Sequence, residues 1–215
     1  MTRSLVVVLV ALAVVVTASA NLLLNPGFED ASGGAGMWGR TPNGWWGGNS
    51  GGSEGWAARS GTNGVAFWSW DNGTYAYFGQ DVLTNMIIGD VITFSIYGKA
   101  ETDYRSSNNE LWMDVELWTN GASTYTVKIT NDIYSAMIGS PNTWNQYTMK
   151  YTNSIAGLSM VKPIVGGGGF TNRGGSQALT WDDADLTVVI PEPTIAALMG
   201  FGGLLFLAVR RMTRK

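Results

Sequence analysis

Residues 111–118 read Leu-Trp-Met-Asp-Val-Glu-Leu-Trp, and this stretch decides the fold class. Its odd-numbered positions are apolar, whereas its even-numbered positions are aromatic or charged. Because successive side chains of a β-strand point to opposite faces, this period of two predicts a strand with one buried face. Residues 92–97 repeat the alternation with Ile, Phe and Ile at every second position.

The same pattern continues on both sides of these stretches, interrupted by Gly, Asn and Ser. Further strands are predicted at residues 65–70, 124–130, 144–151, 160–165 and 179–189. Seven or more strands without a convincing amphipathic helix predict an all-β, two-sheet sandwich over residues 21–190. The composition agrees, because 29 glycines and a charged content of 13% suit short strands joined by Gly-rich turns.

The first 20 residues have the pattern of a secretory signal peptide. Arg3 supplies the positive start, residues 5–16 are uninterruptedly apolar, and Ala18 and Ala20 are the small residues that signal peptidase requires. The alternative is an N-terminal membrane anchor, but this apolar run is short for a membrane span. We therefore expect signal peptidase to cut after Ala20, so that the mature chain begins at Asn21.

The last 25 residues have the pattern of a membrane segment. An uncharged run covers residues 194–209 and is followed by Arg210, Arg211, Arg214 and Lys215. Sixteen helical residues reach roughly 24 Å against a hydrocarbon core of roughly 30 Å, and snorkelling basic side chains can cover the difference. Basic residues after the span favour a cytoplasmic C-terminus, so the strand-rich segment is expected outside the cell membrane.

Pro191, Glu192 and Pro193 stand directly before this span. Residues 191–215 resemble the PEP-CTERM sorting signal, because the tripeptide is followed by an apolar helix and then by a basic end that includes Arg210 and Arg211. The resemblance implies recognition by an exosortase, which cuts near the tripeptide and delivers the protein to the cell surface or extracellular matrix. The alternative is a permanent single-span anchor. Both interpretations place the 21–190 domain outside.

Composition excludes several classes of function. The chain has no cysteine and no histidine, which excludes disulfides, histidine bases and histidine-ligated metals. Without Arg3 and the four C-terminal basic residues, eight basic residues remain, and without Glu192, 15 acidic ones remain. The exported segment therefore carries a net charge of about −7, the wrong sign for binding nucleic acid.

The two ends of the strand-rich segment carry a second resemblance. Residues 21–29, Asn-Leu-Leu-Leu-Asn-Pro-Gly-Phe-Glu, and residues 181–186, Trp-Asp-Asp-Ala-Asp-Leu, resemble the first and last strands of galactose-binding-like jelly rolls. This class contains many carbohydrate-binding modules, and it also has adhesive and structural members. In that class a carboxylate from each of these strands often holds a structural calcium ion, which implies a calcium site at Glu29 and Asp183. The alternative is that both are surface or turn-capping carboxylates.

One face of the 111–118 strand is the candidate ligand site. Trp112, Asp114, Glu116 and Trp118 project from it together. Indole rings offer flat apolar surfaces to sugar rings and carboxylates accept hydroxyl hydrogen bonds, so this mixture predicts weak glycan binding. The alternative is that the aromatic side chains only cover the outside of a sheet. Four more tryptophans are candidates to extend this surface: Trp45, Trp46, Trp68 and Trp70.

Catalysis is the rival interpretation. The side chains of Asp114 and Glu116 leave the backbone at points roughly 7 Å apart, which is superficially the separation of the two carboxylates in an inverting glycosidase. Neighbours on one strand present themselves from the same side of a substrate, whereas such a pair must flank the bond, so we expect no enzyme. The glycine-rich stretches 33–55 and 166–169 lack the helix and lysine of a phosphate loop and are predicted to be loops.

These expectations combine into one function. The chain is predicted to be a non-catalytic cell-surface or matrix protein whose jelly-roll domain binds glycan or simply occupies an extracellular polysaccharide layer. Its expected partners are signal peptidase, exosortase, the membrane and polysaccharide, with calcium as the one expected cofactor.

Overall fold

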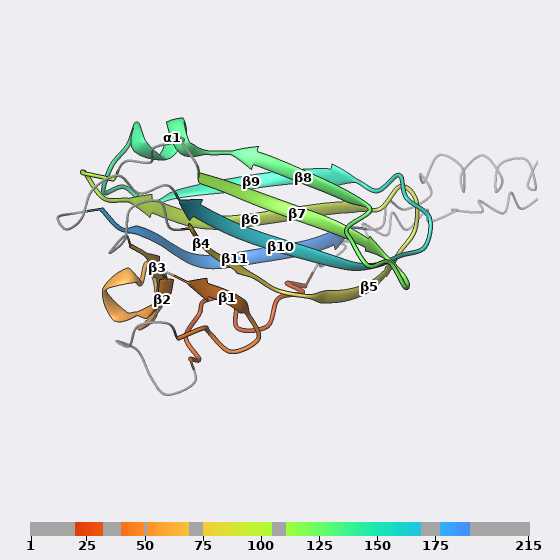
Figure 1. Ribbon diagram of the computed structural model, residues 1–215, viewed down its shortest axis with the longest axis horizontal. Helices are drawn as coiled ribbons and strands as arrows, with labels where there is room; N and C mark the ends of the chain where they lie inside the picture. The colour runs from red at the N-terminus through yellow and green to blue at the C-terminus, as the bar shows by residue number, and fades with distance from the viewer. Residues whose placement is uncertain are drawn as a thin grey trace, which may run out of the picture.

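Two antiparallel β-sheets lie face to face in the computed structural model, and their longer strands run along the long axis of the molecule (Figure 1). The structure describes residues 20–31, 40–49, 51–68, 75–104, 111–168 and 177–189. Both sheets are antiparallel at every pairing of the described strands. The predicted all-β, two-sheet sandwich is confirmed.

The larger sheet has six strands and the smaller has five. The first contains, in order, β1 (Trp46–Asn49), β4 (Tyr75–Gly79), β10 (Leu158–Gly168), β7 (Leu111–Thr119) and β8 (Val127–Asp132), with β5 (Val82–Met86) also paired to β10. The second contains β2 (Gly51–Glu54), β3 (Gly64–Phe67), β11 (Leu179–Val189), β6 (Val91–Ala100) and β9 (Asn145–Thr152). The chain crosses repeatedly between the sheets, as in a jelly roll. Two single turns of helix, η1 (Gly55–Ala57) and α1 (Tyr134–Ile138), complete the described elements.

The core lies between the sheets and is built by the predicted alternation. In β7 the apolar side chains of Leu111, Met113, Val115 and Leu117 are buried, and in β6 the same is true of alternate apolar positions. Trp181 of β11 is fully buried and packs against Phe67 with a ring separation of 6.4 Å. Burial of large apolar side chains therefore stabilises the fold of this chain, which has no disulfide.

The expected first strand at residues 21–29 is wrong. This segment runs beside β11, to which it is tied by hydrogen bonds from Leu22 N to Leu186 O and from Ala184 N to Pro26 O. It cannot continue as a strand because Pro26 has no N–H group, and because Asn25 and Phe28 have φ angles of 49° and 56°. The segment therefore crosses the sandwich as an irregular strap.

The two glycine-rich stretches are not simply loops, contrary to the prediction. Strands β1 and β2 lie within residues 33–55, and β10 continues to Gly168. A glycine-rich sequence can stay in a sheet where side chains from neighbouring strands cover it, and aromatic rings lie over several of these glycines. The predicted 124–130 strand begins later, at Val127, and the predicted 65–70 strand ends at Phe67.

The terminal features lie outside the described residues. These are the signal segment up to Ser19, including Ala18, and the C-terminal residues 190–215 with Pro191, Glu192, Pro193, Arg210 and Arg211. Ala20 is described and exposed. In the part of the chain that the structure describes, no helix has the length and apolar character to cross a membrane.

Candidate functional site

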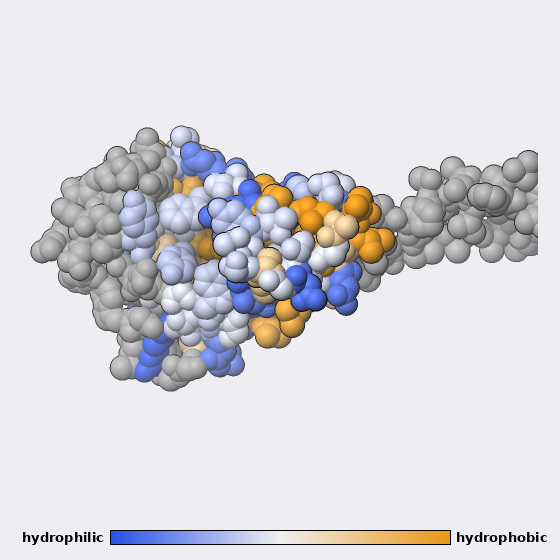
Figure 2. Space-filling model, turned by 45° about the vertical axis from the view of Figure 1, so that its right-hand side comes forward, coloured by the Kyte–Doolittle hydropathy of each residue, from blue (hydrophilic) through white to orange (hydrophobic). Residues whose placement is uncertain are grey.

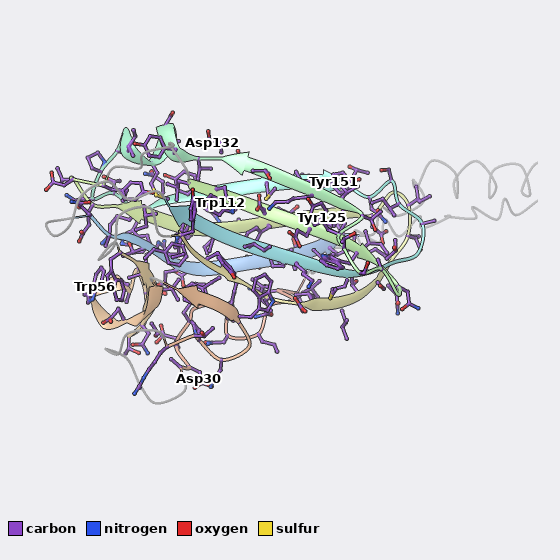
Figure 3. The ribbon with its side chains drawn as sticks, viewed as in Figure 1. Asp30, Trp56, Trp112, Tyr125, Asp132 and Tyr151 are labelled. Carbon is purple, nitrogen blue, oxygen red and sulfur yellow. The ribbon has the colours of Figure 1, made fainter. Side chains whose placement is uncertain are left out.

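The outer face of β7 carries the four side chains that the alternation predicted. Trp112, Asp114, Glu116 and Trp118 point away from the core, because the intervening side chains fill it. β7 pairs with β10 on one side and with β8 on the other, so its outer face lies in the middle of the six-stranded sheet. Figure 3 shows the position of Trp112 on this sheet.

Three glycines on this face lie beneath aromatic rings. Gly166 of β10 is opposite Trp112, and a Cβ atom at Gly166 would overlap the indole ring. In the same way a Cβ at Gly168 would overlap Tyr75, and one at Gly79 would meet the ring of Trp46 at 2.5 Å. The missing side chains therefore let three aromatic rings lie down on the backbone of the sheet.

We call Trp46, Tyr75, Tyr77 and Trp112 the aromatic face. Strand register brings them together, since Gly166 pairs with both Trp112 and Tyr77, and Gly79 pairs with Trp46. The rings of Trp112 and Tyr75 are 6.4 Å apart, and those of Trp46 and Tyr77 are 6.1 Å apart. Tyr75 and Tyr77 are 40% and 37% exposed, so part of each side chain is accessible to solvent. Such a surface can stack on the apolar faces of sugar rings.

Charged side chains beside the aromatic face contact side chains of the opposite charge. Lys128 Nζ on β8 lies 2.7 Å from Asp114 Oδ2 and 3.9 Å from Glu116 Oε1. Partial burial acts to lower the pKa of Lys128, but its hydrogen bond to Asp114 and the attraction of both carboxylates outweigh burial and raise it. Lys128 is therefore charged at neutral pH. Asp114 itself is almost fully buried, and its Oδ1 atom accepts no hydrogen bond from the described residues.

Trp118 belongs to a second polar group on the same sheet. Its indole N–H donates to Glu116 Oε2 at 3.2 Å, and the Lys162 ammonium lies 4.2 Å from the centre of its ring. Lys162 also pairs with Asp81 at 3.2 Å, and Asp81 accepts a 2.8 Å hydrogen bond from the Trp46 indole. Because a lysine already covers Trp118, this residue is a poorer sugar platform than Trp112.

The four other tryptophans predicted to extend this surface have different locations. Trp46 joins the aromatic face, whereas Trp45 is buried, donates to Leu24 O and Asn25 O at 3.2 Å and fixes the N-terminal strap. Trp68 follows β3 in the five-stranded sheet, and its ring packs 5.9 Å from Trp56. Trp70 lies outside the described residues.

Sequence reasoning missed Tyr75 and Tyr77. A signal was present, because residues 75–78 read Tyr-Ala-Tyr-Phe and alternate in the manner of a strand. The missing information was the pairing of this strand with the 166–168 glycines, which only the fold supplies.

Glu29 and Asp183, the predicted calcium ligands, lie near each other. A Cβ atom at Gly27 would be 3.7 Å from Glu29 Cγ and 3.9 Å from Asp183 Oδ1. Both carboxylates are bound to the 59–62 loop, where Glu29 accepts from the Thr62 amide at 2.9 Å and hydroxyl at 2.6 Å. Asp183 accepts from the Ser60 hydroxyl at 2.7 Å and pairs with Arg59. Among the described residues no group of three or more acidic side chains gathers as a metal site, so backbone or water oxygens would have to complete the coordination.

Asp182 is a buried carboxylate next to Asp183 in the chain. Burial raises its pKa to about 6, although hydrogen bonds from the amides of Ser60, Arg59 and Asp183 act in the opposite direction. It reinforces the attachment of the 59–62 loop to β11.

The proposed glycosidase pair has the wrong arrangement in the folded chain. Asp114 and Glu116 both reach toward the same ammonium group of Lys128 from one strand. Carboxylates that cleave a glycosidic bond by inversion must instead flank the bond from opposite sides. The geometry therefore does not fit an inverting glycosidase pair at these two residues.

Comparison with known proteins gives the class of fold. No protein-family model matches the chain, and no curated protein matches it. Among solved structures, the enzymatically active domain of tailspike protein 4 from bacteriophage CBA120 is similar with a TM-score of 0.53 and 11% identity, covering 79% of this chain and 21% of that one. The chain thus spans about a fifth of the tailspike chain, and at this identity the likeness shows the fold alone.

Two carbohydrate-binding domains are also similar. A CBM61 module solved with beta-1,4-galactotriose has a TM-score of 0.44 and 18% identity, over 78% of this chain and 98% of that one. The CBM22-1 xylan-binding domain of a Paenibacillus barcinonensis protein has a TM-score of 0.47 and 15% identity, over 80% and 96%. The strand pairing itself shows that the fold is a two-sheet β-sandwich, and the function must be argued from the aromatic face.

Proposed function

We propose that this protein binds polysaccharide through the aromatic face and has no catalytic activity of its own. The observation that carries the proposal is the set of aromatic rings laid on glycines of the six-stranded sheet, with Tyr75 and Tyr77 exposed. Rings fixed by packing lose little conformational freedom on binding, which favours recognition of a flat apolar sugar face.

The ligand class that suits this face is a neutral polysaccharide. Lys128 is paired with Asp114 and Glu116, and Lys162 with Asp81, so among the described residues no cation on this face remains for an acidic sugar. The exported segment is also negatively charged, which disfavours a polyanion.

The direct test is affinity electrophoresis of the exported segment in gels containing neutral polysaccharides, with a glycan array to widen the search. Trp112→Ala is expected to abolish retardation on the polysaccharides that retard the wild type, because a central aromatic contact carries much of the binding energy. Trp56→Ala is the matched control, since Trp56 is 51% exposed but lies in η1, away from Trp112 (Figure 3). Equal loss in both variants, or no effect of Trp112→Ala, contradicts the proposal.

A structural role without a ligand is the second candidate. Rings that cover glycines also stabilise a sheet that would otherwise expose its backbone, so the same observation favours this role. A protein of this kind shows no saturable retention on any sugar, but its loss changes the extracellular matrix. If no sugar is bound in the gels or on the array, and loss of the protein changes the matrix, the structural role is supported.

We also propose export and sorting, on the sequence of the two ends. In this proposal signal peptidase cuts after Ala20, and an exosortase releases the chain near Pro191-Glu192-Pro193 after residues 194–209 have entered the membrane. Mass spectrometry of the protein from its native host tests this, with Asn21 as the expected first residue. A mature C-terminus at Lys215 decides for a permanent anchor.

Calcium is the cofactor we propose, held by Glu29 and Asp183. What supports it is the approach of these two hard oxygen donors from the N-terminal strap and β11 near Gly27. An ion there adds to the hydrogen bonds that already join the strap and the 59–62 loop to β11, in a chain without disulfides.

A further inference from the structure

One end of the sandwich carries three turns that have no exposed charge. Strand register places them together, because Val91 pairs with both Thr152 and Val189, and Leu158 pairs with both Thr119 and Met86. The turns that follow or precede these positions are residues 87–90, 120–126 and 153–157. Their only carboxylate is Asp90, which is 3% exposed and accepts the Ile87 amide at 2.9 Å.

The same end exposes large apolar side chains. Ile87 and Ile88 are 64% and 61% exposed at the tip of the β5–β6 turn, and Leu83 is 82% exposed on β5. Tyr125, 48% exposed, lies in the β7–β8 turn. Figure 2 shows hydrophobic residues gathered at this end of the described part, and Figure 3 places Tyr125 and Tyr151 toward it. An exposed patch of this kind marks an interaction surface.

The apolar turn is built to stay exposed. Ile87 O accepts hydrogen bonds from Asn153 Nδ2 at 2.8 Å and from the Asp90 amide at 3.2 Å, and the Gly89 amide donates to Asn153 O at 2.7 Å. The backbone of the turn is thereby fixed to the β9–β10 turn. The two isoleucine side chains therefore cannot fold back into the core without breaking these bonds.

The chain leaves the sandwich at this end. β11 ends at Val189, paired with Val91 only three residues from Ile88, and the uncharged run 194–209 begins five residues later. The opposite end is different, because it carries charged residues such as Arg59, Glu101 and Asp103. The molecule is thus apolar where the hydrophobic tail begins and charged at the far end.

We propose that this end of the sandwich rests on the lipid bilayer, with Ile87 and Ile88 inserted among the acyl chains and the tyrosines at headgroup level. Apolar side chains on a fixed turn favour the interfacial region of a bilayer, and tyrosine is enriched there. The strands then stand along the membrane normal, and the aromatic face points sideways, clear of the lipid. This inference rests on the proposed membrane anchoring of the C-terminal tail, and it applies to the anchored form.

Because the chain has no cysteine, one introduced cysteine is the only site that a thiol-reactive spin label can modify. The full chain with Ile88→Cys carries one spin label and is reconstituted in vesicles of neutral phosphatidylcholine, and Ser140→Cys, exposed at the far end beside α1, is the control. The label at position 88 is expected to be several-fold less accessible to a water-soluble nickel complex than the label at 140, and more accessible to oxygen. Equal nickel accessibility at both positions overturns the proposal.

A second labelled site distinguishes insertion into lipid from contact between two copies of the chain. Ser154→Cys in the neighbouring turn is expected to be protected as well, and to lose that protection when Ile87 and Ile88 are both replaced by serine. A second copy of the chain would instead bring two labels at position 88 close together, so that their spins couple. If that coupling disappears on dilution with unlabelled protein while nickel accessibility stays the same, the surface contacts a second copy and the lipid proposal is overturned. If the chain does not fractionate with vesicles at all, the anchoring proposal fails too, whereas fractionation with a water-exposed position 88 overturns only this inference.

Discussion

At the scale of single residues, Gly166 sets the orientation of the Trp112 ring. Glycine is unfavourable in a strand because it has no side chain to pack, and four consecutive glycines from Gly166 argue for a loop on that ground. In the folded chain the indole ring of Trp112 takes the place of the missing side chain. The glycine that destabilises the strand therefore also leaves the space in which the indole ring is held in one orientation.

This link predicts a measurable coupling between the two residues. Gly166→Ala is expected to destabilise the protein by about 1–3 kcal/mol, because the new methyl group displaces the ring. In a Trp112→Ala background the same change is expected to cost less by about 1 kcal/mol or more, because no ring is left to displace. Urea unfolding of the two single variants and the double variant measures the coupling. Additive effects would mean that the ring and the glycine are independent.

Trp118 gives a second contrast at the residue scale. Its indole N–H is bonded to Glu116 and its ring is covered by Lys162, so its role is to organise charges. Trp118→Phe keeps an aromatic side chain but loses the partly buried hydrogen bond to Glu116. Sugar retention is expected to stay within about twofold of the wild type, because Lys162 covers the ring and the sugar does not contact it. Affinity electrophoresis beside Trp112→Ala measures this. A loss as large as that of Trp112→Ala would place Trp118 in contact with the ligand.

The N-terminal strap is an element without regular secondary structure that packs as firmly as a strand. Phe28 is fully buried, and its ring lies 4.9 Å from that of Trp45. Gln80 reinforces the strap by accepting the Leu24 amide at 2.7 Å and donating to Leu24 O at 2.9 Å. Residues 21–31 are therefore part of the sandwich.

Removal of the Trp45 side chain is expected to destabilise the fold by about 3–5 kcal/mol, through the cavity it leaves and the hydrogen bonds it loses. Hydrogen exchange of the Leu22 and Ala184 amides should accelerate with it, because both amides join the strap to β11. Trp56→Ala, at an exposed tryptophan, is expected to change stability by less than about 1 kcal/mol. Unchanged exchange at the strap in Trp45→Ala would contradict this account.

The 59–62 loop is the element on which calcium is expected to act. The melting temperature of the purified domain should rise with calcium and fall with excess chelator, because an ion that binds only the folded state stabilises it. The double variant Glu29→Gln with Asp183→Asn should respond to neither, whereas Glu54→Gln, an acidic residue in β2, should respond like the wild type. A calcium-independent melting temperature of the wild type excludes the site. The two carboxylates would then serve only to hold the loop.

At the scale of the whole molecule, the acidic net charge of the domain differs from the paired charges around the candidate binding surface. Residues 21–190 are acidic as a whole, but the charges beside the aromatic face are paired with one another. Binding should therefore depend on apolar contact and hydrogen bonding, both of which salt screens weakly.

Retention on a neutral polysaccharide is accordingly expected to change by less than about twofold between about 50 mM and about 500 mM salt. Polyuronates are expected to be poor ligands at low salt, because the negative domain repels them. Gel retardation on both polymer types measures these expectations. Strong retention on a polyuronate that disappears with salt would point to a different, cationic site.

The sequence by itself determined what local periodicity and composition can specify. The alternation in residues 92–97 and 111–118 defined strands and the side chains they bury, and it also identified Trp112, Asp114, Glu116 and Trp118 as one face. Period-two alternation is a local property, so it survives without knowledge of the partners of a strand.

Only the tertiary structure decided which strands meet. The pairing of β4, β10 and β7 brought Tyr75 and Tyr77 to Trp112 and turned a glycine run into a strand, and the φ angles at Asn25 and Phe28 turned an expected strand into a strap. Trp46 and Trp45 are adjacent in sequence, but one lies on the aromatic face and the other in the core. Pairings between residues 39 to 93 positions apart depend on how whole faces are buried, and no local pattern in the chain encodes that choice.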